Sequence, residues 1–194
     1  MLRNFARLLL RIGGWTAVGG TLDEPKAVVI AAPHTSNWDG VWALTYKVAV
    51  GLDVKFFAKK SLFWFPLGNL LRWLGAIELD RSRAVNAVQQ AIDEFEHHES
   101  FYFALAPEGT RGLKPGWKTG FYRIARGANV PVYIGFLDFG RRRIGIDAKV
   151  ELTGDPDVDL AVIRSHYEEV EGRWPEKTSP IAFPQKEGRP KAAS

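Results

Sequence analysis

The stretch APHTSNWDGVW, residues 31–41, places a histidine and an aspartate five positions apart. On a continuous helix five residues turn the chain by about 500°, so His34 and Asp39 would face different directions. If Ser36 is instead a helix N-cap, Asp39 lies at the third helical position, where a carboxylate completes a capping box. His34 then folds back over the first turn from the preceding loop. Asp39 can accept a hydrogen bond from one ring nitrogen and leave the other nitrogen as a general base.

The same two residues also have a structural interpretation, in which Asp39 only caps the helix and His34 is satisfied by the backbone. Other catalytic chemistries have weaker support. A serine nucleophile is not indicated, because no nucleophile elbow is present in the chain. The absence of cysteine excludes thiolate chemistry, and the four histidines have no zinc-like spacing with carboxylates, so we expect no metal site.

Cations recur where the chain is expected to leave a strand or enter a helix. A guanidinium can bind a phosphate through two parallel hydrogen bonds, and a helix N-terminus favours anions. Each such cation alone could be a solvated surface charge. The candidates for an anion site are the turn in LAPEGTRG, with Glu108, Gly109, Thr110 and Arg111, the strand end at Arg81, and the helix start with Lys118 and Gly120.

Alternating strand and helix patterns must position these residues. Helices are predicted over 38–50, 82–98 (capped by Ser82) and 117–127, and strands over 26–33, 54–59, 75–80, 101–107, 130–136 and 143–152. The run KAVVIAAP has the pattern of a strand that is buried on both faces. We therefore expect a single α/β domain over residues 15–174, with a mixed, mostly parallel central sheet flanked by helices. Residues 175–194, rich in Pro, Lys and Ser, are predicted to be an extended or disordered tail.

Residues 1–14 form a predicted basic amphipathic helix, with Arg3, Arg7 and Arg11 at a spacing of four. It can lie in the membrane interface with its arginines on anionic lipid, or it can be a surface helix packed on the domain. The longest run without Asp, Glu, Lys or Arg is the twelve residues 27–38, shorter than the roughly 20 that span a bilayer. The net charge of +4 is too evenly spread to predict nucleic-acid binding.

Taken together and in order, these motifs resemble the membrane-associated glycerolipid acyltransferases, which include the 1-acylglycerol-3-phosphate (lysophosphatidate) acyltransferases. HTSNWD resembles the first block of that family, GAIELDR the second, PEGTR the third and VPVYIGF the fourth. The stretch AKKSLFWFPLGNLLRWLGAI resembles the linker between the first two blocks. The resemblance covers about residues 25–140. Pro33, where many members have asparagine, and Gly135, where a second proline is common, depart from the family pattern.

The resemblance implies acyl transfer from acyl-CoA or acyl carrier protein to a hydroxyl of a lysophospholipid, with no other cofactor. His34 would be the base and Asp39 would orient it, while Glu108, Gly109 and Arg111 would bind the glycerol phosphate with help from Arg81. The segment SLFWFPLGNLLRWLG would be a core helix, an acyl-chain tunnel or an interfacial patch. We expect a peripheral protein on the cytoplasmic face of the cell membrane. An ester or thioester hydrolase and a non-catalytic lipid-binding protein are the alternatives.

Overall fold

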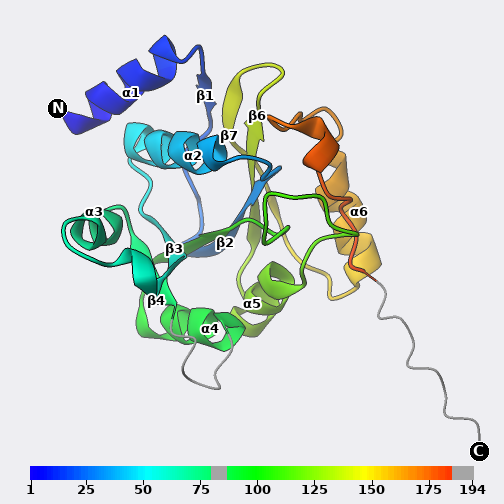
Figure 1. The fold of residues 1–194 in the computed structure, drawn as a ribbon. Helices are drawn as coiled ribbons and strands as arrows, with labels where there is room; N and C mark the ends of the chain where they lie inside the picture. Colours follow the sequence, from blue (N-terminus) through cyan, green and yellow to red (C-terminus); the bar gives the residue numbers. More distant parts are fainter. Residues whose placement is uncertain (80–86, 185–194) are drawn as a thin grey trace, which may run out of the picture.

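In the computed structural model, residues 1–79 and 87–184 are described. A seven-stranded sheet runs through the molecule, with helices on both sides (Figure 1). The described elements are, in chain order, α1 (Leu2–Ile12), β1 (Thr16–Val18), β2 (Lys26–Ala32), α2 (Asn37–Val50), β3 (Val54–Lys59), the 3₁₀ helix η1 (Lys60–Leu62), α3 (Leu67–Trp73), β4 (Ala76–Leu79), α4 (Ala87–His97), β5 (Phe101–Leu105), α5 (Gly120–Ala128), β6 (Val132–Asp138), β7 (Arg143–Val150), α6 (Pro156–Ser165) and the 3₁₀ helix η2 (Pro175–Lys177).

The sheet has the strand order β1-β7-β6-β2-β5-β3-β4. Its described ladders are parallel except for β6 and β7, which pair antiparallel. The mixed, mostly parallel sheet predicted from the sequence is therefore confirmed. Strand β2 lies at the centre, between β5 and β6, and the loops that follow β2 and β5 leave the sheet at the same edge. This edge is where ligands bind in open α/β sheets.

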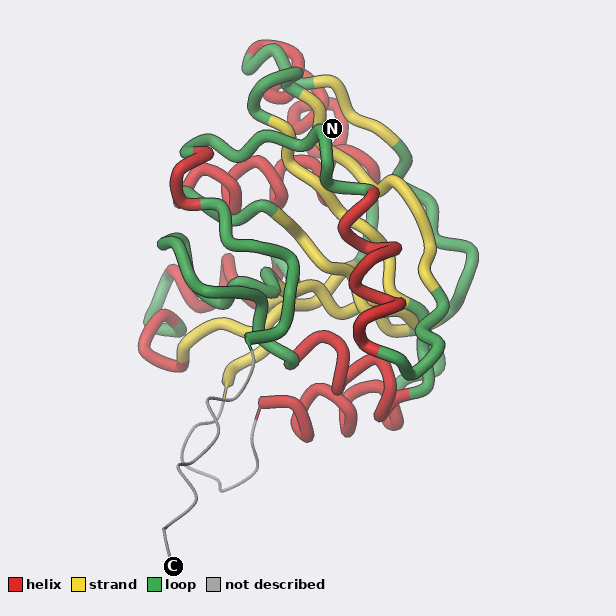
Figure 2. The backbone as a smooth tube through the Cα atoms, turned by 90° about the vertical axis from the view of Figure 1, so that its right-hand side faces the viewer, coloured by secondary structure: helices red, strands yellow, loops and turns green. Residues whose placement is uncertain are grey.

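Two apolar cores lie on opposite faces of the sheet. One contains α1 and α2 residues such as Leu10 and Tyr46, and the other contains residues of α4, α5 and α6 such as Phe95 and Phe121. Strand β2 contributes to both, because its side chains alternate between the faces. Figure 2 shows the same layering after a 90° turn, with the strands between two groups of helices. The prediction of a strand buried on both faces is confirmed.

The structure also contains elements that the periodicity did not predict. Strand β1 has only three residues, and helix α6 buries a narrow stripe whose apolar members are Leu160 and Ile163. Neither has enough buried apolar positions to give a periodic signal. The helix predicted from Trp117 begins three residues later, at Gly120, so Lys118 lies in the preceding loop. The start of the helix predicted over 82–98, including Ser82, falls outside the described residues.

Candidate active site

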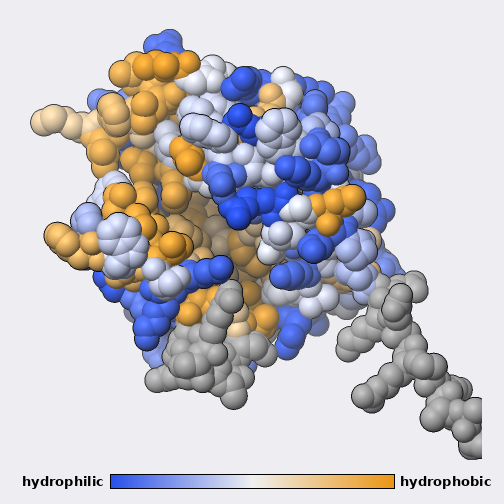
Figure 3. Space-filling model, viewed as in Figure 1, coloured by the Kyte–Doolittle hydropathy of each residue, from blue (hydrophilic) through white to orange (hydrophobic). Residues whose placement is uncertain are grey.

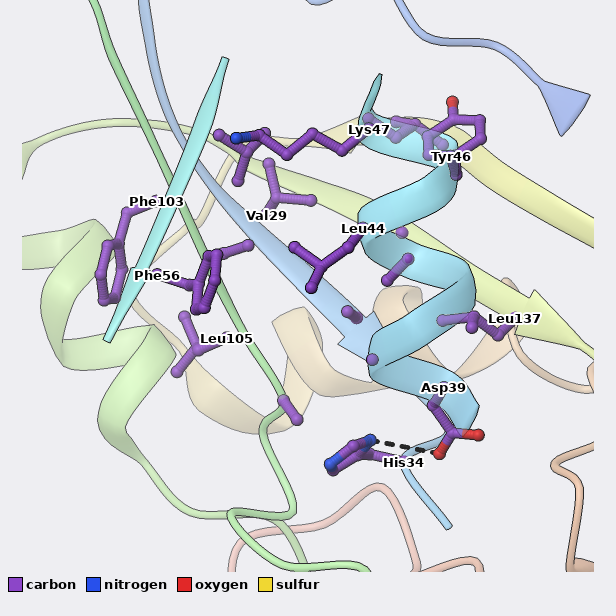
Figure 4. A pocket seen from close by; sticks show the side chains of 18 of the residues that line it. Val29, His34, Asp39, Leu44, Tyr46, Lys47, Phe56, Phe103, Leu105 and Leu137 are labelled. Carbon is purple, nitrogen blue, oxygen red and sulfur yellow. Dashed lines mark ion pairs between the residues drawn. The ribbon is translucent and has the colours of Figure 1, made fainter. Parts of the chain in front are cut away.

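The predicted capping geometry places His34 beside Asp39. Ser36 is the N-cap of α2, its side chain accepts a hydrogen bond from the Trp38 N–H, and Asp39 completes a capping box. Nδ1 of His34 lies 3.1 Å from Oδ2 of Asp39. Figure 4 shows the second ring nitrogen of His34 pointing away from the carboxylate. The structure thus brings together the two residues that the sequence proposed as a pair.

Asp39 is held in place by more than its contact with His34. Its Oδ2 accepts hydrogen bonds from the backbone N–H of Thr35 at 2.6 Å and of Ser36 at 2.7 Å. The Asp39 side chain is only 2% exposed, whereas that of His34 is 27% exposed. Nδ1 of His34 therefore faces a fixed carboxylate, while the other ring nitrogen, Nε2, is turned away from it (Figure 4).

Glu108 positions the histidine from the neighbouring strand end. It follows β5, and its Oε1 accepts a hydrogen bond from the backbone N–H of His34 at 3.0 Å. The side chain is buried. Burial raises the pKa of Glu108, while hydrogen bonds from its own backbone N–H and from that of His34 act in the opposite direction. The observed partner of this carboxylate is therefore the histidine loop, rather than an arginine.

The loop after β5 turns sharply and carries two cations. Gly109 has a φ of +64°, and its N–H donates to the carbonyl of Ala106 at 3.1 Å, so this amide is not free for an anion. A Cβ at position 109 would lie 2.6 Å from Nζ of Lys118, which shows how closely this lysine covers the turn. The exposed Arg111 guanidinium donates to the side-chain oxygen of Asn37, the first residue of α2.

These contacts join the two loops into one site. Asn37 was missed in the sequence, although it lies inside HTSNWD, because its partner is 74 positions away. Thr110 lies in the same turn, between Gly109 and Arg111, and is partly exposed. Arg81, the other predicted cation, falls outside the described residues. The structure therefore gathers His34, Asp39, Glu108, Gly109, Thr110, Arg111 and Lys118 at one sheet edge.

An apolar slot of about 490 Å³ extends from His34 and Asp39 along α2. This space exists because strand β3 separates from strand β5 after its first two residues. Only Val54 and Lys55 of β3 pair with β5, whereas the following residues of β3 pair with β4. The slot is lined mainly by apolar residues of α2 and the neighbouring strands, including Val29, Leu44, Phe56, Phe103 and Leu105 (Figure 4).

The segment SLFWFPLGNLLRWLG does not form this slot, because none of residues 61–75 lines it. Nor is it a core helix, since α3 is short and Phe65, Leu70 and Trp73 near or on it are exposed, Phe65 to 82%. Its interpretation as a core helix is therefore wrong, and the slot beside His34 is formed by other parts of the chain. In Figure 3 apolar side chains gather over α3 and over α1 on the same side of the molecule.

Helix α1 turns its apolar face outward. Ala6 and Leu10 pack into the core, but Phe5 is 56% exposed and Ile12 is 74% exposed. On the packed side, Arg3 donates to the carbonyl of Val50 and Arg7 to that of Ala49, at the C-terminal end of α2. Two of the three arginines expected on lipid therefore bind protein carbonyls. None of the helices within residues 1–79 and 87–184 combines the length and the apolar composition of a membrane span.

Comparison with known proteins identifies the class of the chain. Residues 18–134 match the sequence model of the family described as Acyltransferase, and this match covers more than half of the 194 residues. The chain belongs to this acyltransferase family. The predicted family resemblance is thereby confirmed.

The chain is also similar to two characterised proteins. It is 35% identical over 107 residues to the 1-acyl-sn-glycerol-3-phosphate acyltransferase of Haemophilus influenzae. This match spans 51% of the chain but only 42% of the length of that relative. The crystal structure of the 1-acyl-sn-glycerophosphate (LPA) acyltransferase PlsC from Thermotoga maritima aligns with a TM-score of 0.62 and 20% identity, covering 89% of this chain and 79% of that chain. The structural likeness confirms the α/β fold.

Proposed function

We propose that the protein is an O-acyltransferase that moves a fatty acyl group from an acyl thioester to a hydroxyl of a lysophospholipid such as 1-acylglycerol-3-phosphate. The observation that carries the proposal is the His34–Asp39 pair, 3.1 Å apart, at the end of an apolar slot. Family membership and the relative that acts on 1-acyl-sn-glycerol-3-phosphate support it. The donor is acyl-CoA or acyl carrier protein, and the chemistry needs no metal or further cofactor.

In the proposed mechanism His34 is a general base. Nε2 takes the proton of the acceptor hydroxyl as its oxygen attacks the thioester carbonyl carbon. Asp39 holds the tautomer and stabilises the imidazolium that forms. The tetrahedral intermediate then breaks its C–S bond, and the imidazolium returns the proton to the leaving thiolate. No covalent acyl-enzyme intermediate is required, which is consistent with the lack of cysteine.

The acceptor phosphate is proposed to bind at the exposed cations of the loop after β5. Arg111 can donate two hydrogen bonds to one phosphate, and Lys118 adds a point charge across the Gly109 turn. Asn37 aims the guanidinium toward the first turn of α2. Glu108 does not meet the phosphate in this arrangement, because its buried carboxylate is hydrogen bonded to the backbone of His34.

The test is product analysis by mass spectrometry with a labelled acyl thioester and 1-acylglycerol-3-phosphate. We expect a diacylated phosphate, and we expect His34→Ala to lower turnover by at least about 10²-fold. His166→Ala is the matched control, because His166 also has an aspartate partner, Asp147 at 2.6 Å, but does not line the slot. Free fatty acid without diacylated product would identify a hydrolase. Unchanged turnover in His34→Ala would show that His34 is not the general base.

We also propose that the protein docks peripherally on the cytoplasmic face of the membrane through α1 and α3. A helix that exposes Phe5, Leu8 and Ile12 while two of its three arginines bind carbonyls of α2 is suited to an apolar surrounding. The exposed tryptophans Trp64, before α3, and Trp73, at its end, suit the headgroup region. The anionic-lipid preference rests on the remaining cations, such as Arg11 at the end of α1.

Point substitutions test docking better than deletion of residues 1–14, because that deletion also removes packed residues such as Leu10. Phe5→Glu combined with Ile12→Glu should reduce sedimentation with anionic liposomes while leaving the melting temperature unchanged. Val158→Glu combined with Val162→Glu is the control, since these exposed residues lie on α6. Equal sedimentation of both double variants would argue against α1 as the anchor.

A further inference from the structure

The apolar slot ends at a charged side chain. Lys47 lines the slot near the C-terminal end of α2, at the opposite end from His34 and Asp39. Figure 4 shows its side chain extended across that end, above Val29 and Leu44. Its Nζ donates to the carbonyl of Leu74 at 2.6 Å. The chemical character of the slot therefore changes at Lys47, from hydrocarbon walls to an ammonium.

Neighbouring residues hold this ammonium in place. Leu74 is the C-cap of α3, and a cation is favoured at the carbonyl end of a helix. The next residue, Gly75, leaves room for it: a Cβ there would lie 2.9 Å from Nζ of Lys47 and 2.7 Å from the carbonyl oxygen of Val54. Burial lowers the pKa of Lys47, with Asp53 opposing and Lys55 adding to the shift. The side chain of Lys47 is thus an ordered part of the slot wall and not a solvated surface lysine.

A hydrocarbon chain that reached Lys47 would meet an unfavourable surface. To pass it, the chain would have to displace the partly buried ammonium from the partly buried Leu74 carbonyl and cover both groups with hydrocarbon, which is costly because neither group would keep this partner. From Asp39 to Lys47 the helix rises by about 12 Å, at 1.5 Å per residue. Each methylene within that length gains by burial, and each methylene beyond it does not.

We propose that Lys47 terminates the acyl-chain slot and so sets the upper length of the acyl group that the enzyme transfers. This inference rests on the proposed function and adds the specificity of the same site. It assigns no chemical step to Lys47, which lies at the end of the slot away from the reacting atoms. Its effect should therefore appear in the choice among donors and not in the turnover of short donors.

The experiment is a series of saturated acyl-CoA donors of increasing length, with kcat/KM measured at a fixed acceptor concentration. The wild type should reach a length beyond which kcat/KM stops rising or falls. Lys47→Ala should move that limit to longer donors, with a gain of about fourfold for each added methylene that becomes buried. Donors shorter than the wild-type limit should keep their kcat/KM.

Matched variants separate the slot from charge and folding effects. Lys55→Ala removes a neighbouring lysine that does not line the slot, and it should leave the limit where it is. Lys47→Met keeps much of the stem without the charge, so it should move the limit less than Lys47→Ala and serves as the second variant if alanine unfolds the protein. The same limit in wild type, Lys47→Met and Lys47→Ala would overturn the proposal.

A binding measurement keeps this inference separate from the proposed function. Displacement of a fluorescent fatty acid by free fatty acids of increasing length requires no turnover. If the wild type transfers no acyl group but the binding limit shifts in Lys47→Ala, the role of Lys47 stands and the acyltransferase proposal fails. If transfer occurs and neither limit shifts, the role of Lys47 fails and the acyltransferase proposal stands.

Discussion

The two loops of the candidate site differ in how their functional groups are held. Where the loop after β2 enters α2, the Asp39 carboxylate is buried and accepts hydrogen bonds from two backbone N–H groups of that loop, in addition to its contact with the histidine. In the loop after β5, Glu108 is buried, but Arg111 and Lys118 are exposed. The first loop has the rigidity that proton transfer needs, whereas the second presents long cationic side chains that can adapt to an anion.

This difference predicts which substitutions should lower turnover and which should raise KM. Buried groups with several fixed partners define one geometry, so their substitution should affect turnover. Exposed cations contribute binding that is shared by the ground state and the transition state, so their substitution should mainly affect KM. Glu108 connects the two loops, because it belongs to the second but bonds the backbone of the first.

Substitution of Asp39 tests the rigid loop and should have the largest effect. Asp39→Asn keeps the size of the side chain but no longer fixes the histidine tautomer, so we expect kcat to fall by about 10²- to 10⁴-fold. Asp155→Asn, at the N-cap of α6, is the control for a lost helix-terminal carboxylate. Steady-state kinetics and thermal unfolding together make the measurement. If Asp39→Asn changes only stability, Asp39 is a cap and nothing more.

Substitution of Arg111 tests the adaptable loop. Arg111→Ala should raise the KM for the acceptor by about ten- to a hundredfold through loss of charged hydrogen bonds, with a smaller change in kcat. The KM of Arg111→Lys should fall between those of wild type and Arg111→Ala, because lysine keeps the positive charge but cannot donate the two parallel hydrogen bonds of a guanidinium. Arg141→Ala, which removes a surface arginine paired with Glu169, is the control. A KM that is the same in all four proteins would contradict phosphate binding by Arg111.

The pH dependence of stability tests the connection between the loops and should have the smallest effect. Because burial raises the pKa of Glu108 above the ordinary 4.5, the folded protein favours the protonated carboxyl. That stabilisation is present below 4.5 and is lost as the pH rises through the raised value. Glu108→Gln cannot ionise, so its melting temperature relative to wild type should increase with pH over this range. If the difference in melting temperature between Glu108→Gln and wild type does not vary with pH, the pKa of Glu108 is not raised in the folded protein.

Local features of the site could be predicted from the sequence, and distant ones could not. The capping box of Ser36 and Asp39 spans three positions, so its geometry follows from helix rules alone. The partner of Glu108 lies 74 positions away and depends on β2 and β5 being neighbours.

The apolar regions show the same limit. The aromatic run near α3 has the composition of a tunnel wall, but the space instead opens where β3 leaves β5, which is a property of strand pairing. In α1 the periodicity predicted an amphipathic helix but not which face would be buried. The carbonyls at the end of α2 bind Arg3 and Arg7 and so decide the orientation.

The attachment of α1 to α2 has a consequence for how the proposed lipid acceptor would arrive. Arg3 and Arg7 join the proposed anchor to the helix that also carries Asp39 and Lys47. Docking through α1 would therefore fix the depth and tilt of α2 relative to the bilayer plane. A lysophospholipid could then reach the histidine by lateral diffusion within one leaflet, without passing through bulk water, and its product could return by the same path.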